Sequence, residues 1–355
     1  MTTQATSSLN QVPSASSYVK IETMFTSALN ILASATRIVI VQAENPDGDS
    51  LGSALALEEL LAEAGKEVAL YCAIDIPKYM RYIPGWDRVV KDWPPQYDAA
   101  IIVDTSAEAL LQQALTTAGV RHFFETHPVI VIDHHQSAEG DLPFETTAII
   151  DSTAVATSEI IYNMAKEADW TITPAAAESM FISIQADSLG LTTPSTTAKS
   201  YQVAAELVAH GAVPATIENR RREYMKKPAD ILEYKGKLIE RIEYHLDGKL
   251  ATIHIPWDEI ETYSDRYNPS VLVLEEMRMV EGVEVAVALK TYPDGKVTGK
   301  IRVNAPIAHE VAGYFGGGGH EYAAGFKVFE RYETIMTELL TATEKALAHY
   351  ESSLS

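Results

Sequence analysis

Three short apolar segments, each ending in polar side chains that can bind metal, constrain the fold of this chain more than any other feature. The clearest is the run 129–135, in which four apolar residues lead directly into Asp-His-His. Segments 37–43 and 99–103 behave alike, the first running into the acidic turn 45–49 and the second into Asp104. Ligands of open α/β sheets lie at the carboxyl ends of the strands. The three endings therefore predict one shared site at one edge of a mostly parallel sheet.

Composition limits the partners of the chain. Its 355 residues correspond to about two domains, and its formal net charge is −21. Such an acidic chain disfavours binding to long duplex nucleic acid or to an anionic membrane, because counterion release needs clustered Lys and Arg. The single cysteine, Cys72, excludes an intrachain disulfide and fits a reducing compartment. No apolar run approaches the roughly 20 residues of a membrane span. We therefore expect a cytoplasmic protein with small partners.

The order of the expected elements divides the chain into two α/β domains. Residues 1–17 are rich in Ser, Thr, Gln and Asn and are predicted to be a disordered tail. Strand-like and helical patterns alternate over 18–215, which is typical of a mostly parallel sheet. A charged, helix-prone connector is predicted over 216–245, and a smaller α/β domain over 246–355. We expect a cleft between the two domains and a hinge motion that admits substrate.

Hydrophobic periodicity gives the expected elements. The first domain should have strands at 37–43, 67–73, 99–103 and 129–132, and helices at 21–34, 51–64, 107–118, 153–168 and within 174–210. The second should have strands near 249–255, 283–290, 296–303 and 322–329, and helices near 306–314 and from about 331. Asp294 and Gly295 predict a hairpin turn between two of these strands.

The acidic side chains suit metal-assisted chemistry. Asp47 and Asp49 lie one residue apart, so in an extended turn they could serve two cations, with Asp104 bridging. A site that mixes carboxylates with imidazole favours Mn²⁺ over Mg²⁺. Two such ions about 3.5 to 4 Å apart promote in-line displacement at phosphorus, which predicts phosphoester hydrolysis. Taken alone, the Asp-Gly-Asp turn is more often a polar turn or a helix N-cap. The run Asp133 to His135 is harder to explain in that way, because burying unpaired polar groups is costly.

Five motifs in order carry a family resemblance. They are Asn45-Pro46-Asp47-Gly48-Asp49, Val103-Asp104-Thr105, Asp133-His134-His135, Gln185-Ala186-Asp187-Ser188, and Gly316 to His320 followed by Ala323-Ala324-Gly325. Over roughly residues 35–330 the chain resembles the DHH phosphoesterases that carry a DHH-associated C-terminal domain. It is most similar to the short two-domain members that act as nano-RNases, pAp phosphatases or cyclic-dinucleotide phosphodiesterases. RecJ-type exonucleases of the superfamily are usually much larger.

The resemblance implies a role for each matching residue. In the first domain Asp47 would bind the first metal and Asp49 the second, Asp104 would bridge both, His134 and Asp187 would complete the second site, His135 would contact the scissile phosphate, and Asp133 would orient its neighbours. Asp104 and His135 are thus the expected catalytic residues. In the second domain the substrate would be bound by Arg302, Gly316, Gly317, Gly318, Gly319 and His320. The expected cofactor is one or two Mn²⁺ ions, with Mg²⁺ as the second choice.

The chain departs from the family pattern at one metal position. The first motif of the family begins with a histidine four residues before the first aspartate, and here that position is Ala43. Gln42 and Glu44 offer oxygens, but neighbours on a strand point to the opposite side. Smaller departures are Ala138, where the family often has Asn, and Glu321, where Pro is common.

Four functions remain open at this point. The first is a Mn²⁺-dependent phosphoesterase that uses metal-activated water on small nucleotides, namely short oligoribonucleotides, pAp, or linear and cyclic dinucleotides. The second is a nucleotide-binding or sensor protein that lost catalysis with the change to Ala43. Against it, a retired site has no physical need for clustered carboxylates. A RecJ-like exonuclease is disfavoured by the acidic charge, and a pyrophosphatase by the glycine-histidine loop. A homodimer is expected only from the family.

Overall fold

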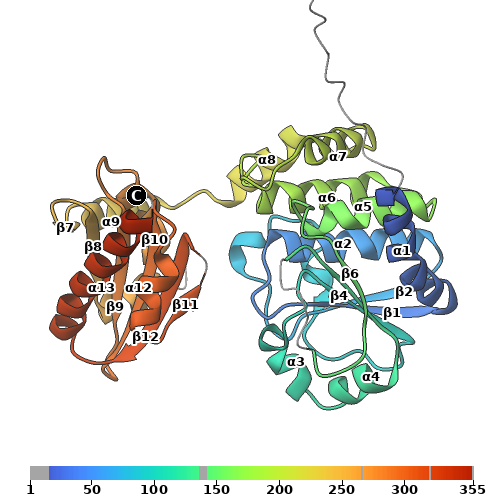
Figure 1. The fold of residues 1–355 in the computed structure, drawn as a ribbon, viewed down its shortest axis with the longest axis horizontal. Helices are drawn as coiled ribbons and strands as arrows, with labels where there is room; N and C mark the ends of the chain where they lie inside the picture. The colour runs from blue at the N-terminus through green and yellow to red at the C-terminus, as the bar shows by residue number, and fades with distance from the viewer. Residues whose placement is uncertain (1–15, 136–141, 265–266, 320, 354–355) are drawn as a thin grey trace, which may run out of the picture. The chain divides into compact units, whose positions relative to one another are not determined.

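The computed structural model describes residues 16–135, 142–264, 267–319 and 321–353 (Figure 1). The chain divides into two compact units, Met1–Lys226 and Lys227–Ser355. Of the expected tail, residues 1–15 lie outside the described part, and α1 begins at Ser16. The expected connector 216–245 spans the boundary between the units, so that α8 belongs to unit 1 and α9 to unit 2.

Unit 1 contains a six-stranded sheet in the order β3-β2-β1-β4-β5-β6. Every neighbouring pair in it is parallel. The strands are β1 (Arg37–Gln42), β2 (Glu67–Tyr71), β3 (Val89–Val90), β4 (Ala99–Val103), β5 (Val129–Asp133) and β6 (Thr147–Ile150). All residues of β4 and β5 are buried, as in sheets that are covered on both faces. The prediction of a mostly parallel sheet is confirmed.

Helices cover both faces of this sheet (Figure 1). One face packs against α1, α2, α5 and α6, and the other packs against α3 and α4. The bounds are α1 (Ser16–Ser34), α2 (Gly48–Glu63), α3 (Gln112–Thr116), α4 (Val120–Thr126), α5 (Thr157–Glu167), α6 (Pro174–Asp187), α7 (Ala198–Ala209) and α8 (Pro214–Tyr224), with 3₁₀ turns η1 (Lys78–Met80), η2 (Trp86–Arg88) and η3 (Glu108–Leu110). The expected helix 107–118 is thus η3 followed by the short α3.

Unit 2 contains a mixed six-stranded sheet in the order β11-β12-β10-β9-β8-β7. The β8–β9 pair is parallel and the other pairs are antiparallel. Its strands are β7 (Glu243–His245), β8 (Leu250–Ile255), β9 (Val285–Thr291), β10 (Lys296–Val303), β11 (Gly318–Gly319) and β12 (Ala323–Phe329). Its helices are α9 (Ala229–Ile239), α10 (Trp257–Tyr263), α11 (Pro269–Arg278), α12 (Ala308–Tyr314) and α13 (Tyr332–Ser353). A second α/β unit in the C-terminal part is confirmed.

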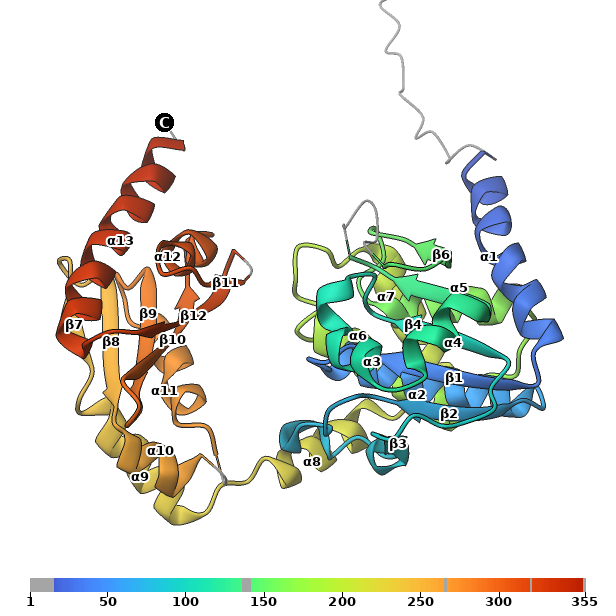
Figure 2. The same cartoon turned by 90° about the horizontal axis from the view of Figure 1, so that it is seen from below.

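The helices of unit 2 also lie on both faces of their sheet (Figure 2). One face packs against α12 and α13, and the other against α9, α10 and α11. The predicted hairpin turn joins the antiparallel strands β9 and β10, with Gly295 at a φ of 79°. Among the described residues, no helix combines the length and the apolarity needed to cross a bilayer.

Candidate active site

The turn after β1 places one aspartate at the start of α2 and buries the next. Asp47 is the N-cap of α2, because its Oδ1 accepts hydrogen bonds from the backbone N–H groups of Asp49 (2.9 Å) and Ser50 (3.0 Å). Such a cap satisfies N–H groups that have no partner within the helix. Asp49, in the first turn, is 1% exposed. The cap therefore fixes the turn that directs the Asp49 carboxylate into the protein.

Hydrogen bonds from three separate segments hold the Asp49 carboxylate. Its Oδ1 accepts from the hydroxyls of Ser53 (2.9 Å) and Ser183 (2.5 Å), and its Oδ2 accepts from the backbone N–H of Thr157 (2.8 Å). Ser53 lies in α2, Ser183 in α6 and Thr157 at the start of α5. These donors satisfy a buried carboxylate that would otherwise be strongly destabilising.

Asp104 combines an unfavourable backbone conformation with an unfavourable charge. It follows β4 with a φ of 62°, in the left-handed region that few residues other than glycine adopt. Its Oδ1 accepts a hydrogen bond from the hydroxyl of Thr157 at 3.1 Å. Burial, followed by the nearby Asp49 carboxylate, holds the pKa of Asp104 well above its usual range. Asp104 therefore combines backbone strain with excess negative charge at the end of β4. This combination is often found at functional sites.

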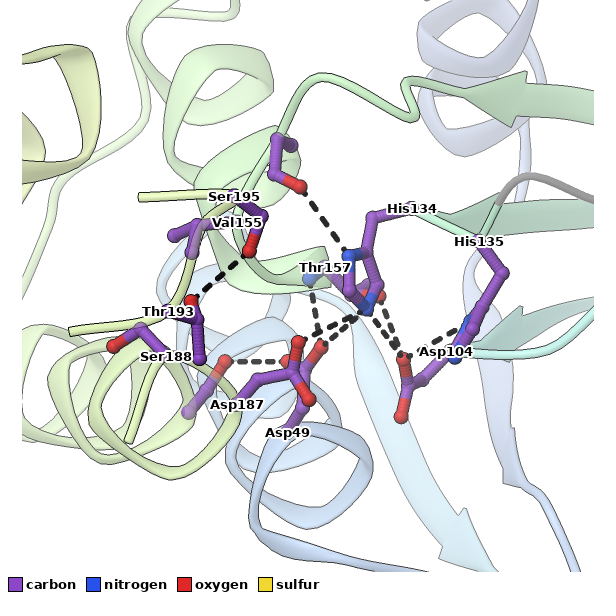
Figure 3. Close-up of polar contacts among 12 residues, drawn as sticks. Asp49, Asp104, His134, His135, Val155, Thr157, Asp187, Ser188, Thr193 and Ser195 are labelled. Atoms are coloured by element: carbon purple, nitrogen blue, oxygen red, sulfur yellow. Dashed lines mark hydrogen bonds and ion pairs between the residues drawn. The ribbon is translucent and has the colours of Figure 1, made fainter. Parts of the chain in front are cut away.

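His134 lies at the centre of the site (Figure 3). Its Nε2 lies 3.5 Å from Asp49 Oδ2, 3.6 Å from Asp104 Oδ1 and 3.5 Å from Asp187 Oδ2. Its Nδ1 lies 3.3 Å from the carbonyl oxygen of Ala154, which can only accept, so Nδ1 carries the proton. In the neutral ring the lone pair of Nε2 then faces the three carboxylates, and this buried atom has no hydrogen-bond partner among the described residues.

This donor set fits a divalent cation. A lone pair that faces three carboxylate oxygens is repulsive, and a cation bound between them makes the contacts attractive. Asp187, at the end of α6, is 34% exposed, yet burial and then the Asp49 carboxylate raise its pKa to about 6. Imidazole with several carboxylates is a ligand set typical of Mn²⁺ and related ions. The structure thus brings together Asp49, Asp104, His134 and Asp187, the residues that the resemblance assigns to the second metal.

Asp133 orients the second histidine of the pair. Its Oδ1 accepts from Nδ1 of His135 at 2.7 Å and from the backbone N–H of His135 at 3.1 Å. Burial alone would raise the pKa of Asp133, but these hydrogen bonds outweigh it and lower the pKa. The same hydrogen bond raises the pKa of His135. His135 is 51% exposed, so its ring is held by Asp133 on one side while the other side is accessible.

Part of unit 1 matches a known protein family. The family described as DHH family, N-terminal domain, matches residues 37–184. These residues are a DHH-family N-terminal domain.

Curated relatives extend beyond the DHH domain. The chain is 29% identical over 294 residues to the bifunctional oligoribonuclease and PAP phosphatase NrnA of Thermus thermophilus, covering 81% of this chain and 83% of the relative. It is 21% identical over 325 residues to the protein of the same name from Bacillus subtilis, covering 90% and 98%. A solved structure of an exopolyphosphatase-related protein from Bacteroides fragilis has a TM-score of 0.78 at 20% identity, covering 94% of this chain and 98% of that one. That likeness shows a shared fold.

The sequence did not indicate the residues that hold the candidate metal ligands in place. Thr157 contacts two of the aspartates, one through its backbone and one through its side chain. Ser53 in α2 and Ser183 in α6 are fully buried. A hydroxyl on the buried face of a helix was the available signal, since such a group needs a partner. The backbone carbonyl of Ala154 left no signal, because any residue can supply it.

Position 43, where the family pattern has a histidine, is buried. Ala43 is 4% exposed, and its carbonyl accepts a hydrogen bond from the Cys72 thiol at 3.4 Å. Glu44 Oε1 accepts from the backbone N–H of Ala114 at 3.0 Å, which engages this carboxylate with α3. Gln42 is 1% exposed, and neither polar atom of its amide has a hydrogen-bond partner among the described residues.

The substrate-binding residues expected in unit 2 lie on β10, on β11 and just before β11. Arg302 is on β10, where its Nη1 donates to the carbonyl of Ile301 at 3.0 Å. A Cβ added to Gly317 would lie 2.3 Å from Gly325 O, and one added to Gly319 would lie 2.5 Å from Ala323 O. Glycine is thus required at both positions for the close approach to β12. His320 and Ala138 lie outside the described residues.

Proposed function

We propose that this chain is a divalent-metal-dependent phosphoesterase that hydrolyses small nucleotides, with short oligoribonucleotides, pAp and linear or cyclic dinucleotides as the candidate substrates. The observation that carries the proposal is the buried, unpaired Nε2 of His134 facing Asp49, Asp104 and Asp187 at 3.5 to 3.6 Å. Burying such a cluster of imidazole and carboxylates lowers the stability of the fold, but it supplies the ligands that a divalent cation needs.

In this proposal four residues hold one cation, namely Asp49, Asp104, His134 and Asp187. Asp47 and Asp104 would hold a second, and Mn²⁺ is the preferred ion because imidazole is among the ligands. A divalent cation supplies Lewis-acid polarisation of a phosphoryl oxygen and lowers the pKa of a bound water. The chain itself fixes the carboxylates through Thr157, Ser53 and Ser183, so little reorganisation accompanies binding.

His135 would act on the phosphate. Asp133 holds the ring proton at Nδ1 and raises the pKa of His135, which keeps a proton on Nε2 in a larger fraction of molecules near neutral pH. A protonated Nε2 can donate a hydrogen bond to a phosphate oxygen and stabilise its charge in the transition state. Arg302, the glycines 316–319 and His320 would bind the rest of the substrate.

The relatives support the substrate class. Both proteins named above carry the name oligoribonuclease and PAP phosphatase, and the similarity to each spans more than four fifths of this chain. A nucleotide-binding or sensor protein without catalysis is not favoured, since the donor set around His134 is present together with the hydroxyls that hold it.

A cytoplasmic location and a homodimer also belong to the proposal. The location is supported by the buried free thiol of Cys72.

The test is hydrolysis by metal-free purified protein supplied in turn with Mn²⁺ and Mg²⁺. The substrates are pAp, a diribonucleotide, a cyclic dinucleotide and inorganic diphosphate, and the products are separated by chromatography. We expect Mn²⁺-dependent release of phosphate from pAp and of mononucleotides from the diribonucleotide. Tight nucleotide binding without turnover under every metal condition would support the sensor alternative instead. Turnover of diphosphate alone would contradict the proposed substrate class.

A further inference from the structure

The turn from Ala154 to Thr157, which leads into α5 and is called the α5 turn below, contacts three of the four residues that face the candidate cation. The carbonyl oxygen of Ala154 accepts a hydrogen bond from Nδ1 of His134 at 3.3 Å. Thr157 donates to Asp49 through its backbone N–H at 2.8 Å and to Asp104 through its hydroxyl at 3.1 Å (Figure 3). A residue that fixes the α5 turn therefore also fixes the spacing of these three side chains.

Glu159, in the first turn of α5, holds the α5 turn from inside the protein. Its side chain is fully buried, and its Oε2 accepts a hydrogen bond from the backbone N–H of Val155 at 3.3 Å. The same oxygen accepts a hydrogen bond from the hydroxyl of Ser200, on α7, at 3.1 Å. One carboxylate oxygen thus ties the α5 turn to a separate helix.

The start of α7 belongs to the segment that follows the fourth candidate ligand. Asp187 is the last residue of α6, and residues 188–197 connect it to α7. Thr197 and Ser200 form a capping box, in which the Ser200 hydroxyl accepts from the backbone N–H of Thr197 at 3.2 Å. The proton of this hydroxyl is then available to Glu159. Glu159 therefore connects the turn that contacts three candidate ligands to the segment that follows the fourth.

The burial of Glu159 strengthens this connection. Hydrogen bonds to a carboxylate are about twice as strong as neutral ones, and a low-dielectric interior strengthens them further. Nζ of Lys199 lies 3.4 Å from Oε1 of Glu159 and partly compensates the buried charge, although the lysine side chain is 44% exposed. Oε1 accepts no hydrogen bond within the described part of the chain. Both connecting hydrogen bonds therefore depend on Oε2, and an amide oxygen of the same reach would make them more weakly.

We propose that Glu159 is a positioning residue for the candidate cation site, acting through its hydrogen bonds to Val155 and Ser200. Groups that orient metal ligands from outside typically contribute about 10- to 100-fold to metal affinity. The role depends first on the reach of the side chain, since the two donors lie on different elements, and then on its charge, which strengthens both bonds. The inference rests on the proposed function and assigns a residue that organises its site.

Two substitutions separate reach from charge. Glu159→Gln keeps the length of the side chain and one acceptor oxygen, so it should weaken Mn²⁺ binding by no more than about threefold. Glu159→Asp keeps the charge but is one methylene shorter, so it cannot reach both donors, and it should weaken Mn²⁺ binding at least about tenfold. The affinities are measured by calorimetry on the full-length protein without substrate, so that they do not depend on turnover.

The matched control is Glu206→Asp. Glu206 lies on α7 and accepts hydrogen bonds from the side chains of Tyr162 and Lys166, so it connects the same two helices further along α5. Shortening Glu206 should lower the melting temperature but change the Mn²⁺ affinity by less than about twofold, because sites without shared partners act independently. The control thus separates the α5 turn from the general packing of α5 on α7.

If Glu159→Asp fails to fold, Ser200→Ala takes its place, because it removes the α7 end of the connection, and it should weaken Mn²⁺ binding at least about threefold. A parent-like Mn²⁺ affinity of the variant that breaks the connection, a loss in Glu159→Gln that equals it, or an equal loss in Glu206→Asp would each overturn the assignment. Mn²⁺ binding in the expected order, without hydrolysis of any substrate by the parent, would refute the proposed function and leave the role of Glu159 intact. Absence of Mn²⁺ binding by the parent would overturn both.

Discussion

At the scale of single residues, the DHH domain concentrates features that oppose folding. Asp104 is buried, has a φ of 62° and lies beside another carboxylate. A residue in such a conformation costs of order 1 to 3 kcal/mol, and it persists only where the surroundings enforce it. Asp and Asn tolerate the left-handed region better than most residues do. Replacing Asp104 by Asn can therefore test the effect of its charge separately from the effect of its backbone conformation.

Asp104→Asn should keep the backbone conformation and remove the charge. We expect turnover of pAp with Mn²⁺ to fall at least about 100-fold, because a bridging carboxylate would be lost. The melting temperature of the metal-free protein should stay the same or rise, because the raised pKa of Asp104 means that its ionised form destabilises the fold. Turnover and thermal melting in EDTA check the two expectations. Near-normal turnover would remove Asp104 from the site.

The sequence predicted the metal-capable residues but not how their atoms are held. Asp49, Asp104 and His134 could be found because they end apolar segments, and a sheet gathers the ends of its strands. The tautomer of His134 depends on the carbonyl of Ala154, twenty residues further on, and the Asp49 carboxylate depends on Thr157 and Ser183. Contacts over such separations follow from helix packing, which residue patterns along the chain do not specify.

At the scale of elements, the close packing of α2 on α6 brings Asp49 and Asp187 to the same site. A Cβ added to Gly48 would lie 2.4 Å from the Cβ of Ala186, and one added to Gly52 would lie 2.7 Å from the carbonyl of Ser179. Both distances are shorter than atoms tolerate, so α2 can approach α6 only because these two positions lack side chains.

Gly52→Ala should therefore force the two helices apart. We expect a loss of about 1 to 3 kcal/mol in the free energy of unfolding, the usual range for overpacking. Mn²⁺ affinity should fall as well, because Asp49 and Asp187 move apart. The matched control is Gly236→Ala in α9, where an added Cβ meets nothing within 4 Å. That change should stabilise the protein by roughly 0.5 to 1 kcal/mol. Denaturant unfolding of both variants measures the difference, and equal destabilisation would contradict the packing argument.

The elements predicted well from the sequence are those with two covered faces. Strands β1, β4 and β5 are continuous apolar runs because helices bury both of their sides. The edge strands β3 and β6 did not stand out, since they are short and partly exposed and lack such runs. Their place in the sheet is set by pairing with β2 and β5, a tertiary effect that overrides weak local preference.

At the scale of the whole molecule, metal binding should contribute to the stability of the fold. Acidic side chains from several elements meet around His134, and a bound cation would relieve their mutual repulsion. A ligand that binds only the folded state stabilises it by an amount that grows with the ratio of its concentration to its dissociation constant. The rise in melting temperature on adding Mn²⁺ therefore reports how complete the set of metal ligands is.

Ala43→His uses this relation to test the first metal position. The site is 4% exposed, so a larger side chain should lower the melting temperature in EDTA. If the imidazole becomes a ligand, added Mn²⁺ should raise the melting temperature of Ala43→His by more than that of the parent, and turnover should increase. Ala43→Phe is the matched control, because it adds a ring of similar size that cannot coordinate a metal. An equal Mn²⁺ response of the two variants would mean that position 43 does not face a metal, so that Asp47 and Asp104 form the first site without it.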